Sequence, residues 1–138
     1  MSEVRNKSIE AKKASAKLAS LSSSVKDAAL ESMAKALRSR MDFIIEENKR
    51  DVEAAIEAGR PKAMIDRLLL DEKRIRDMSE GLRQIKALPD PIGETVSGWT
   101  RPNGLQVMQR RVPMGVIGII YESRPNVTAD AIGLCIKT

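Results

Sequence analysis

The chain has 138 residues and a net charge of +5, its acidic and basic side chains are interspersed, and only Phe43, Trp99 and Tyr121 are aromatic. This length allows one domain with a single core, and the charge pattern predicts solvated helix surfaces, not the basic, aromatic-lined face of a nucleic-acid-binding protein. With one cysteine and no histidine, the chain lacks the usual ligands of zinc, haem and blue-copper sites and the parts of a cysteine–histidine catalytic pair.

The first part of the chain, to about Leu88, has helical periodicity. Apolar residues recur at helical spacing in "EAKKASAKLASL" and again after "SSVKD", where we expect Ser24 to cap a helix. The second stripe consists of Val25, Ala29, Met33, Leu37, Met41, Ile44, Val52 and Ile56. Gly59 and Pro61 end it. The pattern therefore predicts one long amphipathic helix from Val25 to Ile56.

Another helix is predicted from about Asp71 to the "LPDP" sequence. Its apolar residues fall on one face: Ile75, Met78, Leu82 and Ile85. Stripes of leucine, isoleucine and methionine at this spacing are typical of a helix face packed on a core. We therefore assign no chemistry to this part of the chain.

From Thr95 onward the pattern becomes extended. The runs "TVSGWT" and "LQVMQRRV" flank "RPNG", a turn signal, and together predict a β-hairpin over residues 95–112. The following "MGVIGIIY" is β-branched and apolar on both faces, which is typical of a buried parallel strand. "NVTADAIGLCIKT" then predicts a helix, capped by Asn126 or Thr128. Because a single parallel strand has no parallel partner here, we expect the chain to be truncated.

Five polar or charged side chains crowd the end of the predicted strand, in "YESRPN". Ligands of open α/β sheets bind at such strand ends, beside the N-terminus of the next helix. Arg124 suits a phosphate or a carboxylate, and the Asn126 amide can donate to an oxygen that becomes negative during a reaction. The alternative is an ordinary polar loop in which Asn126 serves only as a cap.

The segments "LRQIKALPDPIGE" and "RPNGLQVMQRRVPMGVIGIIYESRPNVTADAIGLCIKT" closely resemble the N-terminal portion of the gamma-glutamyl phosphate reductase family, within the aldehyde dehydrogenase superfamily. The resemblance extends over essentially the whole chain. It implies the start of a three-layer α/β cofactor-binding domain. Its parts are N-terminal helices over residues 1–94, the hairpin over 95–112, and the first strand–loop–helix unit over 113–138.

The resemblance also implies an activity, the NADPH-dependent reduction of glutamyl 5-phosphate to glutamate 5-semialdehyde and phosphate in proline biosynthesis. By similarity to the superfamily, Asn126 would hold the oxyanion formed when a cysteine thiolate attacks the acyl phosphate. The backbone of Tyr121, Glu122 and Ser123 would approach the nicotinamide end of the cofactor. Arg124 would meet the substrate's phosphate or carboxylate.

Members of this family are longer than 138 residues, and their nucleophilic cysteine lies beyond the portion that the chain resembles. Cys135 falls in an apolar helical stretch and does not match the nucleophile's motif, which predicts a buried structural thiol. We therefore expect the chain alone to be inactive. The alternative is a non-catalytic helical module that binds a partner, and stability of the isolated chain would favour it.

The resemblance further implies a homo-oligomer, in which the hairpin is an oligomerisation arm and Trp99 lies at an interface. Packing of Trp99 against its own chain is the open alternative. The lone cysteine, an N-terminus without an apolar core, and an uncharged stretch too short to span a bilayer predict a cytoplasmic protein with no membrane contact.

Overall fold

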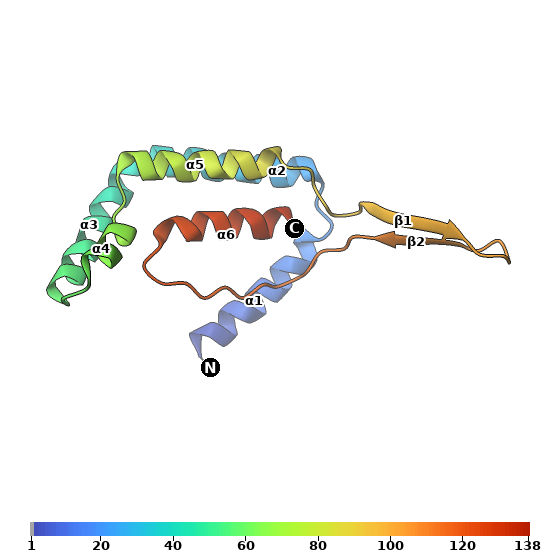
Figure 1. Ribbon diagram of the computed structural model, residues 1–138, viewed down its shortest axis with the longest axis horizontal. Helices are drawn as coiled ribbons and strands as arrows, with labels where there is room; N and C mark the ends of the chain where they lie inside the picture. Colours follow the sequence, from blue (N-terminus) through green and yellow to red (C-terminus); the bar gives the residue numbers. More distant parts are fainter. Residues whose placement is uncertain (1) are drawn as a thin grey trace.

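The computed structural model describes residues 2–138. Within them lie six helices and one two-stranded antiparallel sheet (Figure 1). In chain order the elements are α1 (Glu3–Leu18), α2 (Ser23–Ser39), α3 (Met41–Glu57), α4 (Lys62–Leu68), α5 (Glu72–Ala87), β1 (Thr95–Thr100), β2 (Gln106–Arg110) and α6 (Pro125–Lys137). Helices α2 and α5 lie side by side, α6 packs against both, and the hairpin projects away from the helices. The predicted order of helices, hairpin and terminal helix is confirmed.

The core lies between α2, α5 and α6. All four residues of the predicted α5 stripe are buried, together with Leu30 and Ala34 of α2. The buried Ser79 hydroxyl donates to the Ala34 carbonyl oxygen at 2.9 Å, which joins α5 to α2 inside the core. On the outer side of the same pair, Glu31 accepts hydrogen bonds from Lys86 and Arg83, and these bonds lower its pKa. Because all four residues of the predicted stripe are buried, the core-facing side of α5 was predicted correctly from periodicity alone.

Helix α6 approaches this pair closely because Gly133 has no side chain. A Cβ atom placed on Gly133 would lie 2.8 Å from Leu82 Cδ2 and 2.9 Å from Ile85 Cδ1. Both distances are shorter than carbon–carbon contact, and both neighbours are buried. Gly133 therefore sets the distance between α6 and α5.

The substitution Gly133→Val is expected to destabilise the chain by about 1–3 kcal/mol, because overpacking forces side chains and backbone apart. Urea unfolding followed by circular dichroism measures the effect. Gly81→Ala is the matched control, since the nearest atom to its added Cβ is Asp130 Oδ1 at 3.4 Å. That change should be neutral or stabilising by up to about 1 kcal/mol through helix propensity. Equal midpoints for Gly133→Val and the wild-type chain would contradict this account of the packing.

The prediction of one helix from Val25 to Ile56 is wrong, because the chain breaks at Arg40 (φ −109°, ψ 20°) into α2 and α3. Tertiary contacts that the periodicity does not reveal hold α3 in place after the break. The buried Asn48 side chain donates to the Leu68 carbonyl oxygen at 2.9 Å and accepts from the Leu70 N–H at 2.6 Å. These bonds hold α3 against the end of α4, a helix that the sequence analysis did not predict.

Two predicted caps also differ from the structure. Helix α2 begins one residue before Ser24, with Ser22 at the N-cap and no side-chain cap hydrogen bond. Helix α6 begins at Pro125, so neither Asn126 nor Thr128 is its cap. Proline is well suited to the first helical position, because its fixed φ fits the helix and its missing N–H needs no partner there.

The hairpin forms as predicted over "RPNG". Trp99 pairs with Val107 and Gly98 with Met108, and the register is irregular between Thr95 and Ser97. Gly104 (φ 84°) permits the turn, in which its N–H donates to the Arg101 carbonyl oxygen at 2.8 Å.

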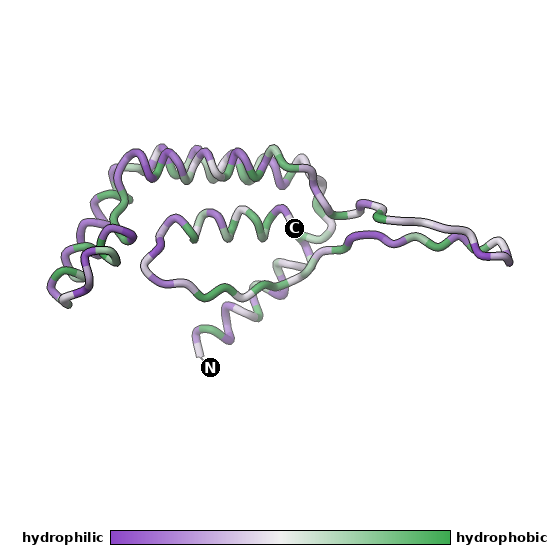
Figure 2. The backbone as a smooth tube through the Cα atoms, in the orientation of Figure 1, coloured by the Kyte–Doolittle hydropathy of each residue, from purple (hydrophilic) through white to green (hydrophobic). Residues whose placement is uncertain are grey.

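The predicted buried strand at "MGVIGIIY" is not formed. Residues 111–122 have no regular secondary structure, and the green stretch below α6 in Figure 2 shows their apolar character. Their large side chains are exposed, Ile120 completely and Val112 by 74%. A parallel strand exists only by pairing, and residues 2–138 contain no parallel partner for this segment.

Candidate functional site

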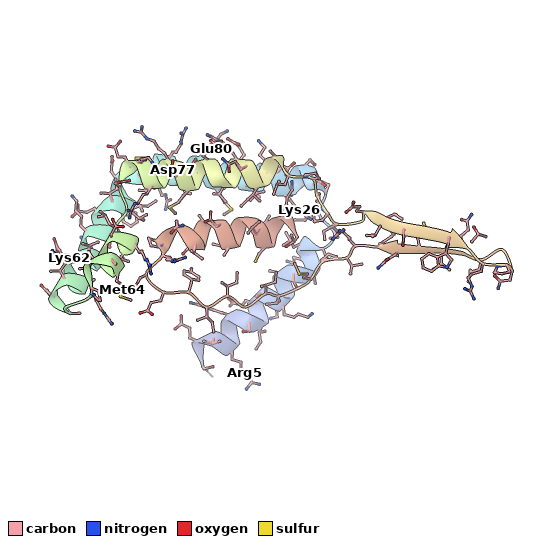
Figure 3. The ribbon with its side chains drawn as sticks, in the orientation of Figure 1. Arg5, Lys26, Lys62, Met64, Asp77 and Glu80 are labelled. Atoms are coloured by element: carbon pink, nitrogen blue, oxygen red, sulfur yellow. The ribbon has the colours of Figure 1, made fainter. Side chains whose placement is uncertain are left out.

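A cleft of about 460 Å³ opens between α4, α5 and the first turns of α6. Its lining residues are Asp66, Arg67, Leu69, Leu70, Arg74, Asp77, Met78, Arg124, Asn126 and Asp130. In Figure 1 the N-terminal end of α6 faces α4, and Figure 3 shows Asp77 on α5 and Met64 on α4. The cleft brings together three segments that are far apart in the sequence.

The local backbone places Asn126 in this cleft. Ser123 adopts a left-handed conformation (φ 52°), Arg124 has non-helical backbone angles (φ −139°, ψ 79°), and Pro125 starts α6. A residue before proline avoids helical geometry, so the loop must turn sharply into the helix here. Asn126 is consequently the second residue of α6, beside the backbone N–H groups that carry the positive end of the helix dipole.

Arg74 builds the wall of the cleft and is fully engaged in doing so. Its guanidinium donates to the Leu69 carbonyl oxygen at 2.7 Å and to the Asp66 carboxylate at 3.0 Å, and also to the Asp66 carbonyl oxygen. These bonds hold the C-terminal end of α4 against α5. Arg74 and Asp66 are therefore structural, and they fix the position of Arg67 on α4.

Of the other polar side chains that line the cleft, one is paired and four are not. Asp77 accepts a hydrogen bond from Lys73 at 2.9 Å, and this bond raises the pKa of Lys73. Arg67, Arg124, Asn126 and Asp130 make no side-chain hydrogen bond or ion pair with any other residue between 2 and 138. Two cations, one anion and one amide thus line the cleft with their bonding capacity unused.

The predicted site residues do not all meet. Arg124 and Asn126 line the cleft, whereas Tyr121 lines a separate apolar groove of about 590 Å³ between α1, residues 115–121 and α6. The Tyr121 hydroxyl is bonded to the Thr128 hydroxyl at 2.7 Å. Glu122 and Ser123 line neither cavity. The loop therefore links the cleft with a second, apolar surface.

Cys135 lies on α6 and lines the apolar groove, not the cleft that holds Asn126. Its side chain is half-buried, whereas the sequence predicted a buried thiol. The apolar groove that Cys135 lines leaves this side of α6 partly open. Cys135 and Asn126 thus belong to different surfaces of the chain.

Neither Arg67 nor Asp130 was identified as a site residue from the sequence. Arg67 lies on α4, whose signal was a proline followed by apolar residues at helical spacing in "PKAMIDRL". Asp130 is four residues after Asn126, and that spacing places two residues on one helix face. Neither signal identifies a cleft, because both depend on how α4 and α6 pack.

Comparison with known proteins gives the relatives of the chain. No family model matches it. The gamma-glutamyl phosphate reductases of Moorella thermoacetica and Heliobacterium modesticaldum are 57% and 56% identical to it, over 99% of this chain. The chain matches the N-terminal portion of gamma-glutamyl phosphate reductases. It spans about a third of the length of these relatives, 32% and 33% respectively.

Solved structures of gamma-glutamyl phosphate reductases agree with this match. The enzyme from Thermotoga maritima is 39% identical, with a TM-score of 0.95 over 99% of this chain and 33% of its own. The enzyme from Saccharomyces cerevisiae is 31% identical, with a TM-score of 0.92 over 99% of this chain and 35% of its own. The resemblance to gamma-glutamyl phosphate reductase and the α/β fold class are thereby confirmed.

No helix within residues 2–138 is both long and apolar enough to cross a bilayer. No group of three or more histidine, cysteine, aspartate or glutamate side chains in the same range is placed to hold a metal ion.

Proposed function

We propose that the full-length enzyme containing this chain reduces glutamyl 5-phosphate to glutamate 5-semialdehyde and phosphate in the cytoplasm, with NADPH as reductant. The observation that carries the proposal is the cleft itself. It holds an unpaired Asn126 amide and an unpaired Arg124 at a helix N-terminus, in a chain 57% identical to a gamma-glutamyl phosphate reductase. The comparisons give no support to the alternative of a non-catalytic helical module.

Asn126 acts on the carbonyl oxygen of the acyl phosphate. When a thiolate adds to the carbonyl carbon, the oxygen gains a negative charge until the bond to phosphate breaks and a thioester remains. The Asn126 NH₂ group donates a hydrogen bond to this oxygen, and the N-terminal N–H groups of α6 add a positive potential. The Asn126 amide does not have to be released from another bond within residues 2–138 before it can act, whereas the Val127 N–H of α6 donates to the Arg124 carbonyl oxygen at 3.1 Å.

Arg124 binds the anionic end of the substrate. Its guanidinium is exposed and offers a planar set of donors that matches a phosphate or a carboxylate in a bidentate arrangement. Its position two residues before Asn126 keeps the charge close to the attacked carbonyl. Arg124 thereby stabilises the phosphate as it leaves.

The backbone of Tyr121, Glu122 and Ser123 suits the nicotinamide end of NADPH. None of their N–H or C=O groups forms a backbone hydrogen bond within residues 2–138, so these groups are free to pair with the carboxamide of a nicotinamide. Bound NADPH supplies the hydride for reduction of the thioester. The apolar groove beside Tyr121 offers a surface for an aromatic ring.

The nucleophile of the proposed reaction lies outside these 138 residues. Cys135 is the one cysteine of the chain and lies on the apolar groove, away from Asn126. We therefore propose that the 138-residue chain alone is inactive. The same proposal assigns the hairpin to subunit contact, supported by its projection from the helices (Figure 1) and by the half-exposed Trp99.

The reverse reaction tests the proposed activity. Full-length enzyme should reduce NADP⁺ in the presence of glutamate 5-semialdehyde, and the rate should require inorganic phosphate, because phosphate must displace the thioester. Absorbance at the NADPH maximum follows the reaction. Turnover that is equal with and without phosphate would contradict a reductase of acyl phosphates, and absence of turnover by folded enzyme would contradict the proposal as a whole.

A further inference from the structure

We propose that the same cleft recognises the α-amino acid end of the substrate, with Asp130 binding the α-ammonium group and Arg67 the α-carboxylate. The inference rests on the proposed function, which supplies a substrate with an amino acid head group at one end and an acyl phosphate at the other. It adds two specificity residues that act at the end remote from the chemistry.

The charges of the cleft fit such a molecule. Once the Arg74–Asp66 and Lys73–Asp77 pairs are set aside, the charged side chains that line the cleft and have no partner within residues 2–138 are Arg67, Arg124 and Asp130. A glutamyl phosphate carries two anionic groups and one cationic group. Each charged group of the substrate therefore has one oppositely charged side chain in the cleft, and the two arginines leave the net positive charge that an anionic ligand requires.

The spacing of Asn126 and Asp130 matches the length of the substrate. Residues four apart on a helix have Cβ atoms about 5–6 Å apart on one face. In a glutamate skeleton the carbonyl carbon and the α-nitrogen are separated by four bonds, or roughly 5 Å when extended. A substrate whose carbonyl oxygen meets Asn126 can thus reach Asp130 with its ammonium group without leaving α6.

Arg67 is held on the opposite wall. It lies on α4, and the three bonds of the Arg74 guanidinium fix the end of that helix beside α5. Because the α-carboxylate and the α-ammonium share one carbon atom, the two groups that bind them must come from different directions. Arg67 on α4 and Asp130 on α6 satisfy this condition, since both line the cleft from separate elements.

A structural role for Asp130 is the competing explanation. Its carboxylate could stabilise α6 through the helix dipole, and it packs near Gly81 of α5, with Oδ1 3.4 Å from the position of an added Cβ. A structural role would make Asp130 substitutions affect every substrate alike. Substrate recognition makes the effect depend on the amino group, and this difference is measurable.

The experiment compares three aldehydes with full-length enzyme in the phosphate-dependent assay: glutamate 5-semialdehyde, 5-oxopentanoate, which lacks the amino group, and 4-aminobutanal, which lacks the carboxylate. Asp130→Asn should lower kcat/KM about 10- to 100-fold for the two aldehydes with an amino group, the usual scale for a lost hydrogen bond to a charge. It should leave 5-oxopentanoate unchanged. Arg67→Gln should lower kcat/KM for the two aldehydes with a carboxylate, glutamate 5-semialdehyde and 5-oxopentanoate. It should leave kcat/KM for 4-aminobutanal unchanged.

Asp77→Asn is the matched control, because Asp77 lines the same cleft and already bonds Lys73. Its three rates should keep the wild-type ratios. Arg67 is exposed on α4, so Arg67→Gln provides the test if Asp130→Asn does not fold. Equal losses for all three aldehydes, or no loss in either variant, would overturn the subsite while leaving the proposed reaction in place.

If the enzyme shows no turnover, a binding measurement distinguishes the proposed amino acid subsite from the proposed reaction. Calorimetric titration of the same enzymes with L-glutamate needs no reaction, and the wild-type enzyme should bind it more tightly than Asp130→Asn does. Weaker binding by the variant supports the subsite even if the wild-type enzyme shows no phosphate-dependent turnover, in which case the proposed reaction falls alone. Equal binding of L-glutamate and glutarate by the wild-type enzyme would contradict recognition of the ammonium group.

Discussion

Replacement of Asn126 by alanine in the full-length enzyme is expected to lower kcat for glutamate 5-semialdehyde about 100- to 1000-fold, the usual effect of removing one oxyanion donor. The amide lines the cleft, has no partner within residues 2–138, and lies in the first turn of α6. Its removal costs no packing, because Asn126 is exposed. The loss should therefore appear in the chemical step and not in folding.

The readouts follow from that assignment. KM should change less than kcat, because the hydrogen bond strengthens only as the oxygen becomes negative. Asn103→Ala is a matched control, an exposed asparagine whose side chain accepts from the Leu105 N–H in the hairpin turn. Its kcat should equal that of the wild-type enzyme. A tenfold or smaller loss in Asn126→Ala would remove Asn126 from the mechanism.

Asp90→Ala is expected to destabilise the chain by about 3–5 kcal/mol, the range for breaking a buried ion pair by deleting one partner. Lys26, which is labelled in Figure 3, is 4% exposed and donates to the Asp90 carboxylate, with Nζ 3.1 Å from Oδ2. Without that carboxylate, the nearest acceptor for Lys26 is the Lys137 carbonyl oxygen at 3.5 Å. A charged ammonium would be left buried and poorly paired. Urea unfolding at neutral pH measures the loss.

The Lys26–Asp90 pair also makes the free energy of unfolding depend on pH in the acid range. Burial alone would raise the pKa of Asp90, but hydrogen bonds from the Ile92 N–H, the Ser23 hydroxyl and Lys26 outweigh it, so the pKa falls below its usual value of 3.8. Asp90 therefore contributes fully above that usual value, and its contribution disappears as the pH falls through the lowered pKa. Asp90→Asn keeps an oxygen acceptor for Ile92 and should show a smaller loss with a flatter acid profile. An identical acid profile in both proteins would contradict the pairing.

The sequence predicted correctly those elements whose structure depends on residues close together in the chain. The α5 stripe, the Gly59 stop (φ 66°) and the "RPNG" turn depend on periodicity and on backbone freedom, and the structure confirms all three. The break at Arg40 and the loss of the strand at 114–121 depend on distant partners. The Asn48 side chain holds α3 by hydrogen bonds to Leu68 and Leu70, and a parallel strand needs a neighbour that residues 2–138 do not contain.

The candidate site divides in the same way. Arg124 and Asn126 were identified from the sequence because a polar cluster after an apolar run is visible in one short segment. Arg67 and Asp130 were not identified, because they line one cleft only through the packing of α4 against α5 and of α6 against α2 and α5. The Arg74 bonds and the absent side chain of Gly133 create that packing, and a sequence pattern does not show either of them.

The most direct measurement is the phosphate-dependent assay on two purified proteins whose masses have been verified. One is the 138-residue chain, and the other is a chimera with this chain in place of the matching residues of the Moorella thermoacetica reductase. Our account predicts turnover by the chimera and none by the chain, because the chain supplies the oxyanion donor but not the nucleophile. Robust turnover by the chain alone would contradict it, since Cys135 or another group would have to attack the substrate. A folded chimera without activity would contradict it as well.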